Sequence, residues 1–149
     1  MYNDLFMQMA LEEAKKAYNK DEVPVGAVIV YDNKVISKCH NNMKKKNNIT
    51  NHAEIDAIIE ASRIFNDWRL NDCEMYVTLE PCPMCAGAIL NSRIKKIYIG
   101  AKSNINSNKM IVESILQNSE YYHFVDVEYV DNKEASIILS EFFNNKRGN

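Results

Sequence analysis

Three potential metal ligands in two short segments constrain this chain more than any other feature of its sequence. The first segment is His52-Ala53-Glu54, and the second is Pro81-Cys82-Pro83-Met84-Cys85, in which Cys82 follows His52 by thirty residues. An imidazole and two thiolates suit zinc. A structural zinc ion normally takes four protein ligands, whereas a hydrolytic zinc ion takes three and leaves the fourth position to water. The sequence therefore predicts a fold that brings His52, Cys82 and Cys85 to one catalytic zinc ion per subunit.

The same motif contains a carboxylate that is not needed as a ligand. Water on zinc is acidic enough to give hydroxide near neutral pH, and Glu54 would take its proton and pass it to a ring nitrogen or a leaving amine. His-x-Glu followed by Pro-Cys-x-x-Cys is the signature of zinc-dependent nucleobase deaminases. A lone Cys-x-x-Cys also occurs in redox enzymes, zinc ribbons and ordinary cores. The alternative interpretation of these residues is therefore a closed structural zinc site or an ordinary part of the core.

Length and composition predict one compact domain over residues 1–149. The chain is 46% hydrophobic and 26% charged, with 4 Gly and 3 Pro, which is typical of a soluble globular protein. No apolar run approaches the roughly 20 residues that span a bilayer, and the first residues lack a signal-peptide pattern. Four cysteines are too few for a disulfide scaffold. We therefore expect a cytoplasmic protein without a membrane partner, with Cys39 and Cys73 as small buried hydrophobic residues.

The charge of the chain gives no general attraction to nucleic acid. The formal net charge is −2 and the pI is near 5.9, so any RNA binding must be local. Taken alone, each basic cluster is more typical of a solvated surface than of a phosphate clamp. The clusters are Lys44, Lys45 and Lys46; Arg93, Lys95 and Lys96; and Lys146 with Arg147.

Hydrophobic periodicity predicts alternating helices and strands. Helices are expected at residues 4–19 (capped by Asn3 or Asp4), from 52 onward (capped by Thr50 or Asn51), at 82–91, at 110–117, and in a final segment capped by Asp131. Strands are expected at residues 25–31, 34–40, 74–79, 95–100 and 124–129. The first two strands should form an antiparallel hairpin around Asp32-Asn33, followed by a polar loop at 41–51. The last two strands are too far apart in sequence for a hairpin and should pair in parallel.

The expected helix starts would bring the ligands together. His52 and Glu54 fall in the first turn of one helix, and Cys82 and Cys85 share a face at the start of another. Pro81 fits the first positions of that helix, where a missing N–H costs nothing. The helix dipole favours thiolates there, so two helix starts should face each other across one zinc ion.

With these residues placed, the chain resembles the bacterial tRNA-specific adenosine deaminase family within the cytidine deaminase-like fold. The resemblance covers nearly the whole length and includes Asn41, eleven residues before His52. The other matching segments are Glu22-Val23-Pro24-Val25-Gly26-Ala27-Val28, Val77-Thr78-Leu79-Glu80-Pro81-Cys82, Met84-Cys85-Ala86-Gly87-Ala88, Ser92-Arg93-Ile94 and Phe142-Phe143. It implies a three-layer α/β/α fold with a five-stranded mixed sheet whose last two strands are parallel.

The resemblance also implies an activity and its partners. The family are homodimeric, zinc-dependent hydrolases that act on a cyclic amidine C–N bond and convert adenosine to inosine at the wobble position of a tRNA anticodon stem-loop. We therefore expect RNA editing with no further protein partner required. The reaction is attack of hydroxide on C6 followed by loss of ammonia.

Site residues follow from the matching positions. His52, Cys82 and Cys85 would bind zinc and Glu54 would shuttle protons. Asn41 would hydrogen-bond the purine, Val25 would help to wall the base pocket, and the backbone around Ala53 and Pro81 would contact the reacting centre. Possible RNA contacts are Lys44, Lys45, Lys46, Ser103, Phe143, Lys146 and Arg147. Without the resemblance, the residues alone favour Asn41 as a turn residue in an asparagine-rich loop.

The chain departs from the family pattern in two places. After Gly100-Ala101 the family has an acidic residue and a glycine-rich stretch, whereas this chain has Lys102-Ser103-Asn104-Ile105-Asn106-Ser107-Asn108-Lys109. Ser103 could bond a ribose hydroxyl or a phosphate, though not as a carboxylate would. Asn51 stands where the family has a small alanine.

Two other functions remain open at this point. One is a deaminase of a free nucleobase or nucleoside, of the guanine or cytosine type, which would suit the acidic pI and the altered 102–109 segment. The other is a zinc-bearing RNA-binding module without turnover. Glu54 argues against the second, because a purely structural site has no use for an unliganded carboxylate beside the metal.

Overall fold

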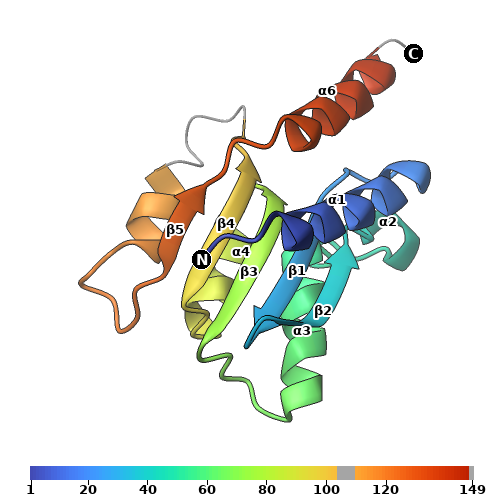
Figure 1. Cartoon of the computed structure of the whole chain (residues 1–149). Coiled ribbons are helices and arrows are strands. Elements are labelled where there is room, and N and C mark those ends of the chain that lie inside the picture. The colour runs from blue at the N-terminus through green and yellow to red at the C-terminus, as the bar shows by residue number, and fades with distance from the viewer. Residues whose placement is uncertain (104–109, 148–149) are drawn as a thin grey trace.

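The computed structural model describes residues 1–103 and 110–147, and a mixed sheet runs through the middle of that part of the chain (Figure 1). The sheet has five strands in the order β2-β1-β3-β4-β5. Their bounds are β1 Gly26–Tyr31, β2 Lys34–His40, β3 Cys73–Leu79, β4 Lys96–Ala101 and β5 Asp126–Tyr129. β1 pairs antiparallel with β2 and β3, while β3–β4 and β4–β5 are parallel. The predicted mixed sheet with its last two strands parallel is confirmed.

Helices cover both faces of the sheet, which gives the predicted three layers. In Figure 1, α1 (Asp4–Asn19) crosses in front of the sheet, and α3 (Ala53–Phe65) and α4 (Pro83–Asn91) lie behind it. The π-helical segment η1 (Val112–Leu116) packs beside α4, and α6 (Lys133–Arg147) packs on β4 and α1. A short helix, α2 (Met43–Lys46), occupies part of the segment that was predicted to be a loop.

Side chains that alternate along the strands build a core on each face. Toward α1, strand residues pack with helix residues in one cluster: Val28, Val30, Tyr76 and Tyr98 with Phe6, Met7 and Ala10. Toward α3 and α4, a larger cluster contains Ala27, Ile29, Met75 and Val77 with Ala57, Ala61 and Ile89. Strands buried on both faces explain why residues 25–31 are a nearly continuous apolar run.

Helix α1 lies close to β1 at a single glycine. A Cβ atom on Gly26 would lie 1.9 Å from the backbone oxygen of Ala10 and 2.8 Å from the backbone nitrogen of Ala14. No side chain fits that gap, so the helix can pack this tightly only on glycine.

The hairpin between β1 and β2 is the one predicted from sequence. Asp32 and Asn33 both have positive φ angles, 49° and 61°, as a two-residue turn between right-twisted strands requires. Asp and Asn tolerate this conformation better than most residues, which is why they mark the turn.

The predicted helix caps are partly wrong. Asn3 does cap α1, since its side-chain oxygen accepts a 3.0 Å hydrogen bond from Leu5 N. The N-cap of α3, however, is His52 in extended backbone, and neither Thr50 nor Asn51 serves. The start of α6 is capped by Asn132, whose side-chain oxygen accepts from Ala135 N at 3.0 Å; Asp131, predicted as the cap, has a left-handed φ of 48°.

The start of α4 also differs from the prediction. Cys82 is its N-cap, in extended backbone, and Pro83 is its first residue. The proline that exploits the missing N–H at the first helical position is therefore Pro83, not Pro81.

Of the two cysteines outside the motif, Cys73 lies in the core, as predicted, and Cys39 lies at its edge. Cys73 is fully buried and Cys39 is half-buried against the same cluster. Burial raises the pKa of Cys73 to about 11 and that of Cys39 to about 12, so both thiols stay neutral. Within residues 1–103 and 110–147, no helix has both the length and the apolar character that crossing a membrane requires.

Candidate active site

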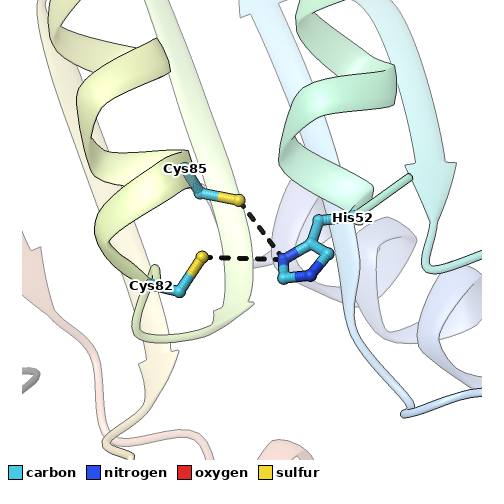
Figure 2. A group of neighbouring side chains, drawn as sticks. All are labelled: His52, Cys82 and Cys85. Carbon is cyan, nitrogen blue, oxygen red and sulfur yellow. Dashed lines mark hydrogen bonds between the residues drawn. The ribbon is translucent and has the colours of Figure 1, made fainter. Parts of the chain in front are cut away.

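Two helix starts bring the three potential metal ligands together. His52 is the N-cap of α3, Cys82 is the N-cap of α4, and Cys85 lies in the first turn of α4. Figure 2 shows both sulfur atoms directed at the His52 ring, with distances to Nδ1 of 3.7 Å from Cys82 and 3.5 Å from Cys85. Neither cap residue makes a side-chain hydrogen bond to its helix. The ligand atoms are therefore turned toward each other and away from the helix ends.

These distances suit a tetrahedral metal ion. A Zn–S bond of about 2.3 Å and a Zn–N bond of about 2.0 Å at the tetrahedral angle place sulfur and nitrogen about 3.5 Å apart. All ligand atoms of His52, Cys82 and Cys85 lie within 4.8 Å of one another. The group has the donor set and the spacing to hold one metal ion through three protein ligands.

The local electrostatics already favour a thiolate at this point. Hydrogen bonds from the Cys85 thiol and from His52 lower the pKa of Cys82 to about 4, although burial opposes the shift. The hydrogen bond to Cys82, together with burial, raises the pKa of Cys85. The hydrogen bond to Cys82 also raises the pKa of His52, against the effect of burial. A negative charge is thus stable at the start of α4, as a cation site requires.

Glu54 lies one residue inside α3 and is only 3% exposed. Burial raises the pKa of its carboxyl group to about 7. A carboxyl group with a pKa near the working pH can both accept and release a proton during a reaction. Glu54 and His52 line the same cavity, so this group lies beside the predicted metal site.

Asn41 connects the strand side of the site to the helix side. Its backbone N–H donates to Val25 O at 3.1 Å, and its side-chain oxygen accepts from Ala53 N at 2.8 Å. Asn41 therefore satisfies one of the free N–H groups at the start of α3, the role that had been predicted for Thr50 or Asn51. With the oxygen engaged in this way, the side-chain NH₂ group is the donor that Asn41 can offer to a ligand.

A cavity of about 550 Å³ opens at the ligand group. Its lining includes five of the residues predicted as metal, catalytic or substrate-binding residues and two predicted RNA contacts: Val25, Asn41, His52, Glu54 and Cys82, and Ser103 and Phe143. Ala53 and Pro81 are buried beside it instead of lining it. The Ala53 N–H points to Asn41, so the predicted contact of this backbone with a reacting centre stays a prediction.

The cavity also has lining residues that were not predicted. Four of them come from one face of α6: Ser136, Leu139, Ser140 and Asn144. With the predicted Phe143 they recur at the helical spacing i, i+3, i+4, i+7 and i+8. Glu80 and Lys102 also line the cavity. The signal for Glu80 was its place in the Glu-Pro-Cys segment, whereas the serines of α6 break the apolar stripe and carried no signal.

Two of the predicted basic contacts, Lys44 and Lys146, pair with the same carboxylate. Asp21 Oδ2 lies 3.1 Å from Lys44 Nζ, and Asp21 Oδ1 lies 2.5 Å from Lys146 Nζ, so one exposed carboxylate joins α2 to the end of α6. Met43 and Asn144, near these lysines in sequence, line the cavity. Lys45 and Lys46 are exposed beside Lys44. The Arg147 side chain and residues 104–109 lie outside the described part of the chain.

The remaining basic cluster lies elsewhere. Lys96 pairs with Asp126 and Glu128 at 3.4 and 3.3 Å, and the Arg93 guanidinium lies 4.2 Å from the ring centre of Tyr122. None of these side chains lines the cavity within the described residues.

Comparison with known proteins gives consistent results. The family model of MafB19-like deaminases matches residues 1–147. The tRNA-specific adenosine deaminase of Aquifex aeolicus (strain VF5) is 45% identical over 149 residues, which cover 100% of this chain and 99% of that protein. A solved structure from work on A-to-I editing by tRNA:A34 deaminases at the wobble position of transfer RNA is 36% identical, with a TM-score of 0.81, over 92% of this chain and 100% of that chain.

A guanine deaminase from Bacillus subtilis is similar to a lesser degree. It is 29% identical, with a TM-score of 0.66, and the match covers 99% of this chain and 95% of that chain. Of the proteins named here, those described as acting on tRNA are more similar to this chain than the one described as acting on guanine.

Proposed function

The chain belongs to the tRNA-specific adenosine deaminase family, and from this premise we propose that it converts adenosine to inosine at the wobble position of a tRNA anticodon by hydrolytic deamination. One observation supports this most: His52 and Cys82 of the His-Cys-Cys ligand group line one cavity together with the buried carboxyl group of Glu54. A closed structural zinc site would have no cavity at its fourth position.

We propose that the metal is zinc, one ion per subunit, held by His52 Nδ1 and the thiolates of Cys82 and Cys85. When bound, zinc supplies Lewis acidity, which lowers the pKa of water beside it toward neutrality. The chain contributes the charge that the ion needs, because a thiolate is already favoured at Cys82.

Glu54 would move the protons. Its carboxylate would take one proton from the attacking water and deliver it to the purine ring. It would then take the second proton from the new hydroxyl group on the reacting carbon and deliver it to the amino group, which leaves as ammonia. A pKa of about 7 suits both transfers, because the group is then neither a strong acid nor a strong base at neutral pH. Its burial also keeps bulk water from competing for the proton.

Asn41 and the apolar walls would bind the base. The NH₂ group of Asn41 would donate to an acceptor atom of the purine, and Val25 and Leu139 would pack against the ring. A cavity of about 550 Å³ has a size typical of small-ligand sites and suits one unstacked nucleoside. The backbone around Ala53 and Pro81 would close the site on the side of the reacting carbon.

The RNA partner would be an anticodon stem-loop, whose unpaired bases can be splayed into a pocket. Lys44, Lys45, Lys46, Lys146 and Arg147 would contact phosphates, Ser103 a ribose or phosphate, and Phe143 a neighbouring base. We place this activity in the cytoplasm, in a single domain over residues 1–149.

We also propose a homodimer. Ile59 and Ile64 on α3 are 59% and 51% exposed, and Trp68, shortly after that helix, is 56% exposed. A second copy would cover such large apolar side chains. No additional protein partner is needed for the reaction.

The second candidate is deamination of a free base such as guanine, which the similarity to the Bacillus subtilis guanine deaminase and the pI near 5.9 favour. Zinc-loaded protein should be incubated with an unmodified tRNA that has adenosine at the wobble position, which is then sequenced for inosine. Ammonia release from guanine, cytosine and adenosine should be measured in parallel. Inosine in the tRNA supports the first candidate; ammonia from a free base with no change in the tRNA would select the second.

A further inference from the structure

Glu80 is a buried carboxylate that no step of the proposed reaction uses. It follows β3, two residues before Cys82, is 4% exposed and lines the cavity. Burying a charged group costs free energy because the group loses its hydrogen bonds to water. Hydrogen bonds within the protein must therefore replace them. The partners of Glu80 therefore indicate what the residue does.

Both carboxylate oxygens of Glu80 accept short hydrogen bonds from other strands or their ends. Oε1 accepts from the backbone N–H of Ser103 at 2.6 Å, and Oε2 accepts from the Tyr129 hydroxyl at 2.7 Å. Ser103 follows β4, and Tyr129 ends β5. One side chain thus joins the ends of three neighbouring parallel strands.

Tyr129 extends this network to Lys102. The Lys102 ammonium lies 5.5 Å from the ring centre of Tyr129, within the range of a cation–π interaction. Lys102 and Ser103 both line the cavity. Glu80 and Tyr129 therefore hold the position of an ammonium group and a hydroxyl-bearing residue at one rim of the cavity, and both groups can donate to phosphate or ribose oxygens.

We propose that Glu80 is a positioning residue for substrate RNA: through Ser103 and Tyr129 it fixes the Lys102-Ser103 rim where the ribose–phosphate backbone beside the target base is bound. This inference rests on the proposed function, since it assumes a nucleic acid substrate. It separates Glu80 from Glu54, which lies in the same cavity and would act on the reacting atoms. Loss of Glu80 should weaken RNA binding, whereas loss of Glu54 should stop the chemistry.

Three variants test the network step by step. Glu80→Ala removes both acceptors. Glu80→Gln keeps one carbonyl oxygen for Ser103 N and offers an NH₂ group to the Tyr129 oxygen, so it should rescue most of the loss. Tyr129→Phe removes a single hydroxyl and keeps the ring beneath Lys102. The matched control is Tyr98→Phe, which removes a Tyr–Glu hydrogen bond of 3.3 Å to Glu74 in the same sheet, away from the cavity lining.

Each variant should be assayed for zinc content, for amide hydrogen exchange at Ser103, and for KM and kcat with an anticodon stem-loop RNA. We expect Glu80→Ala to raise KM and Ser103 exchange about tenfold or more, and Tyr129→Phe to raise both about threefold. We expect kcat within about twofold of the unchanged protein and no change in zinc content. Tyr98→Phe should leave KM and Ser103 exchange unchanged.

The outcomes separate this inference from the proposed function. Unchanged Ser103 exchange in Tyr129→Phe, and in Glu80→Ala if that variant folds, would overturn the inference. So would faster exchange with an unchanged KM, because the rim would then not touch substrate. If the unchanged protein forms no inosine, the proposed function fails, and the Kd of the RNA for the same variants decides the role of Glu80 in place of KM.

Discussion

The side-chain oxygen of Asn41 accepts a 2.8 Å hydrogen bond from the backbone N–H of Ala53, so a single buried amide both lines the cavity and caps helix α3. The two halves of the amide therefore have different tasks. The oxygen stabilises the helix start next to His52, and the NH₂ group remains for the substrate.

Substituting Asn41 should separate these tasks. Asn41→Asp keeps the acceptor for Ala53 N and loses the donor, so we expect normal zinc content and melting temperature with kcat/KM lower by about 100-fold. Asn41→Ala loses both and should also lower the unfolding free energy by about 1–2 kcal/mol. Steady-state kinetics and thermal unfolding measure the two effects. Full activity in Asn41→Asp would show that the NH₂ group is not used.

Glu54→Gln should stop the reaction and leave the metal site intact. The amide has nearly the shape of the carboxyl group but cannot accept a proton from water, so kcat should fall by about 100-fold or more. Metal analysis should still give one zinc ion per chain. Glu60→Gln, in the same helix but outside the cavity lining, is the control. If activity survives the change at Glu54, the proton-shuttle role is wrong.

Removing the metal should abolish activity and lower stability together. Each tenfold rise in free zinc above its Kd should add about 1.4 kcal/mol to the unfolding free energy, because zinc binds the folded site far better than the unfolded chain. Chelation followed by titration with zinc, monitored by thermal unfolding, measures this dependence. Cys85→Ser should weaken the dependence of the unfolding free energy on zinc concentration. Cys39→Ala, outside the ligand group, should leave it unchanged. A stability independent of zinc in the unchanged chain would contradict the proposed metal site.

Gly26→Ala should be strongly destabilising because its Cβ atom would overlap the backbone of α1, 1.9 Å from Ala10 O. Backbone cannot move aside as a side chain can, so we expect a loss of about 3 kcal/mol or more in unfolding free energy. Gly87→Ala is the matched control, since nothing lies within 4 Å of the added Cβ. In the middle of α4 it should stabilise by about 0.5–1 kcal/mol. Denaturant unfolding measures the stability of both variants. If Gly87→Ala were less stable than Gly26→Ala, the described packing of α1 on β1 would be wrong.

The hydrogen-bonded pair of buried Glu13 and partly buried His40 predicts a loss of stability in acid. Burial raises the pKa of Glu13, but hydrogen bonds from Lys16 at 2.6 Å and His40 at 3.0 Å outweigh it, so the net pKa lies below the ordinary value of 4.5. A lowered carboxyl pKa stabilises the folded state above pH 4.5, and this contribution is lost as the pH falls through the folded-state pKa. Glu13→Gln should reduce the pH dependence of unfolding below pH 4.5, whereas Glu12→Gln on the exposed face should change it little. Equal pH profiles for the unchanged chain and Glu13→Gln would refute this assignment.

The parts of the fold that could be predicted from sequence are those with a local physical cause. Strands buried on both faces read as apolar runs, Asp32-Asn33 marks a turn that needs positive φ, and a long connection requires a parallel crossover. The ligand spacing likewise reflects local chemistry, because Cys82 and Cys85 share the first turn of one helix.

The predictions were wrong or incomplete where contacts between residues distant in sequence, and not local sequence preferences, determine the structure. Thr50 and Asn51 are good cap residues by type, but α3 is capped from a distance by Asn41, which frees His52 to face the cysteines. The α6 face and Glu80 meet at the cavity only because α6 packs on β4, which pairs with β3. No pattern along the chain encodes that proximity.

Asp21 pairs with both Lys44 and Lys146 and so changes how this basic surface of the protein would bind a polyanion. Two ammonium groups and one carboxylate sum to a charge of +1, so an arriving phosphate must displace or share an internal anion. Because Asp21 already neutralises part of the charge of the two lysines, binding of a polyanion to this surface should depend less steeply on ionic strength than the number of lysines suggests.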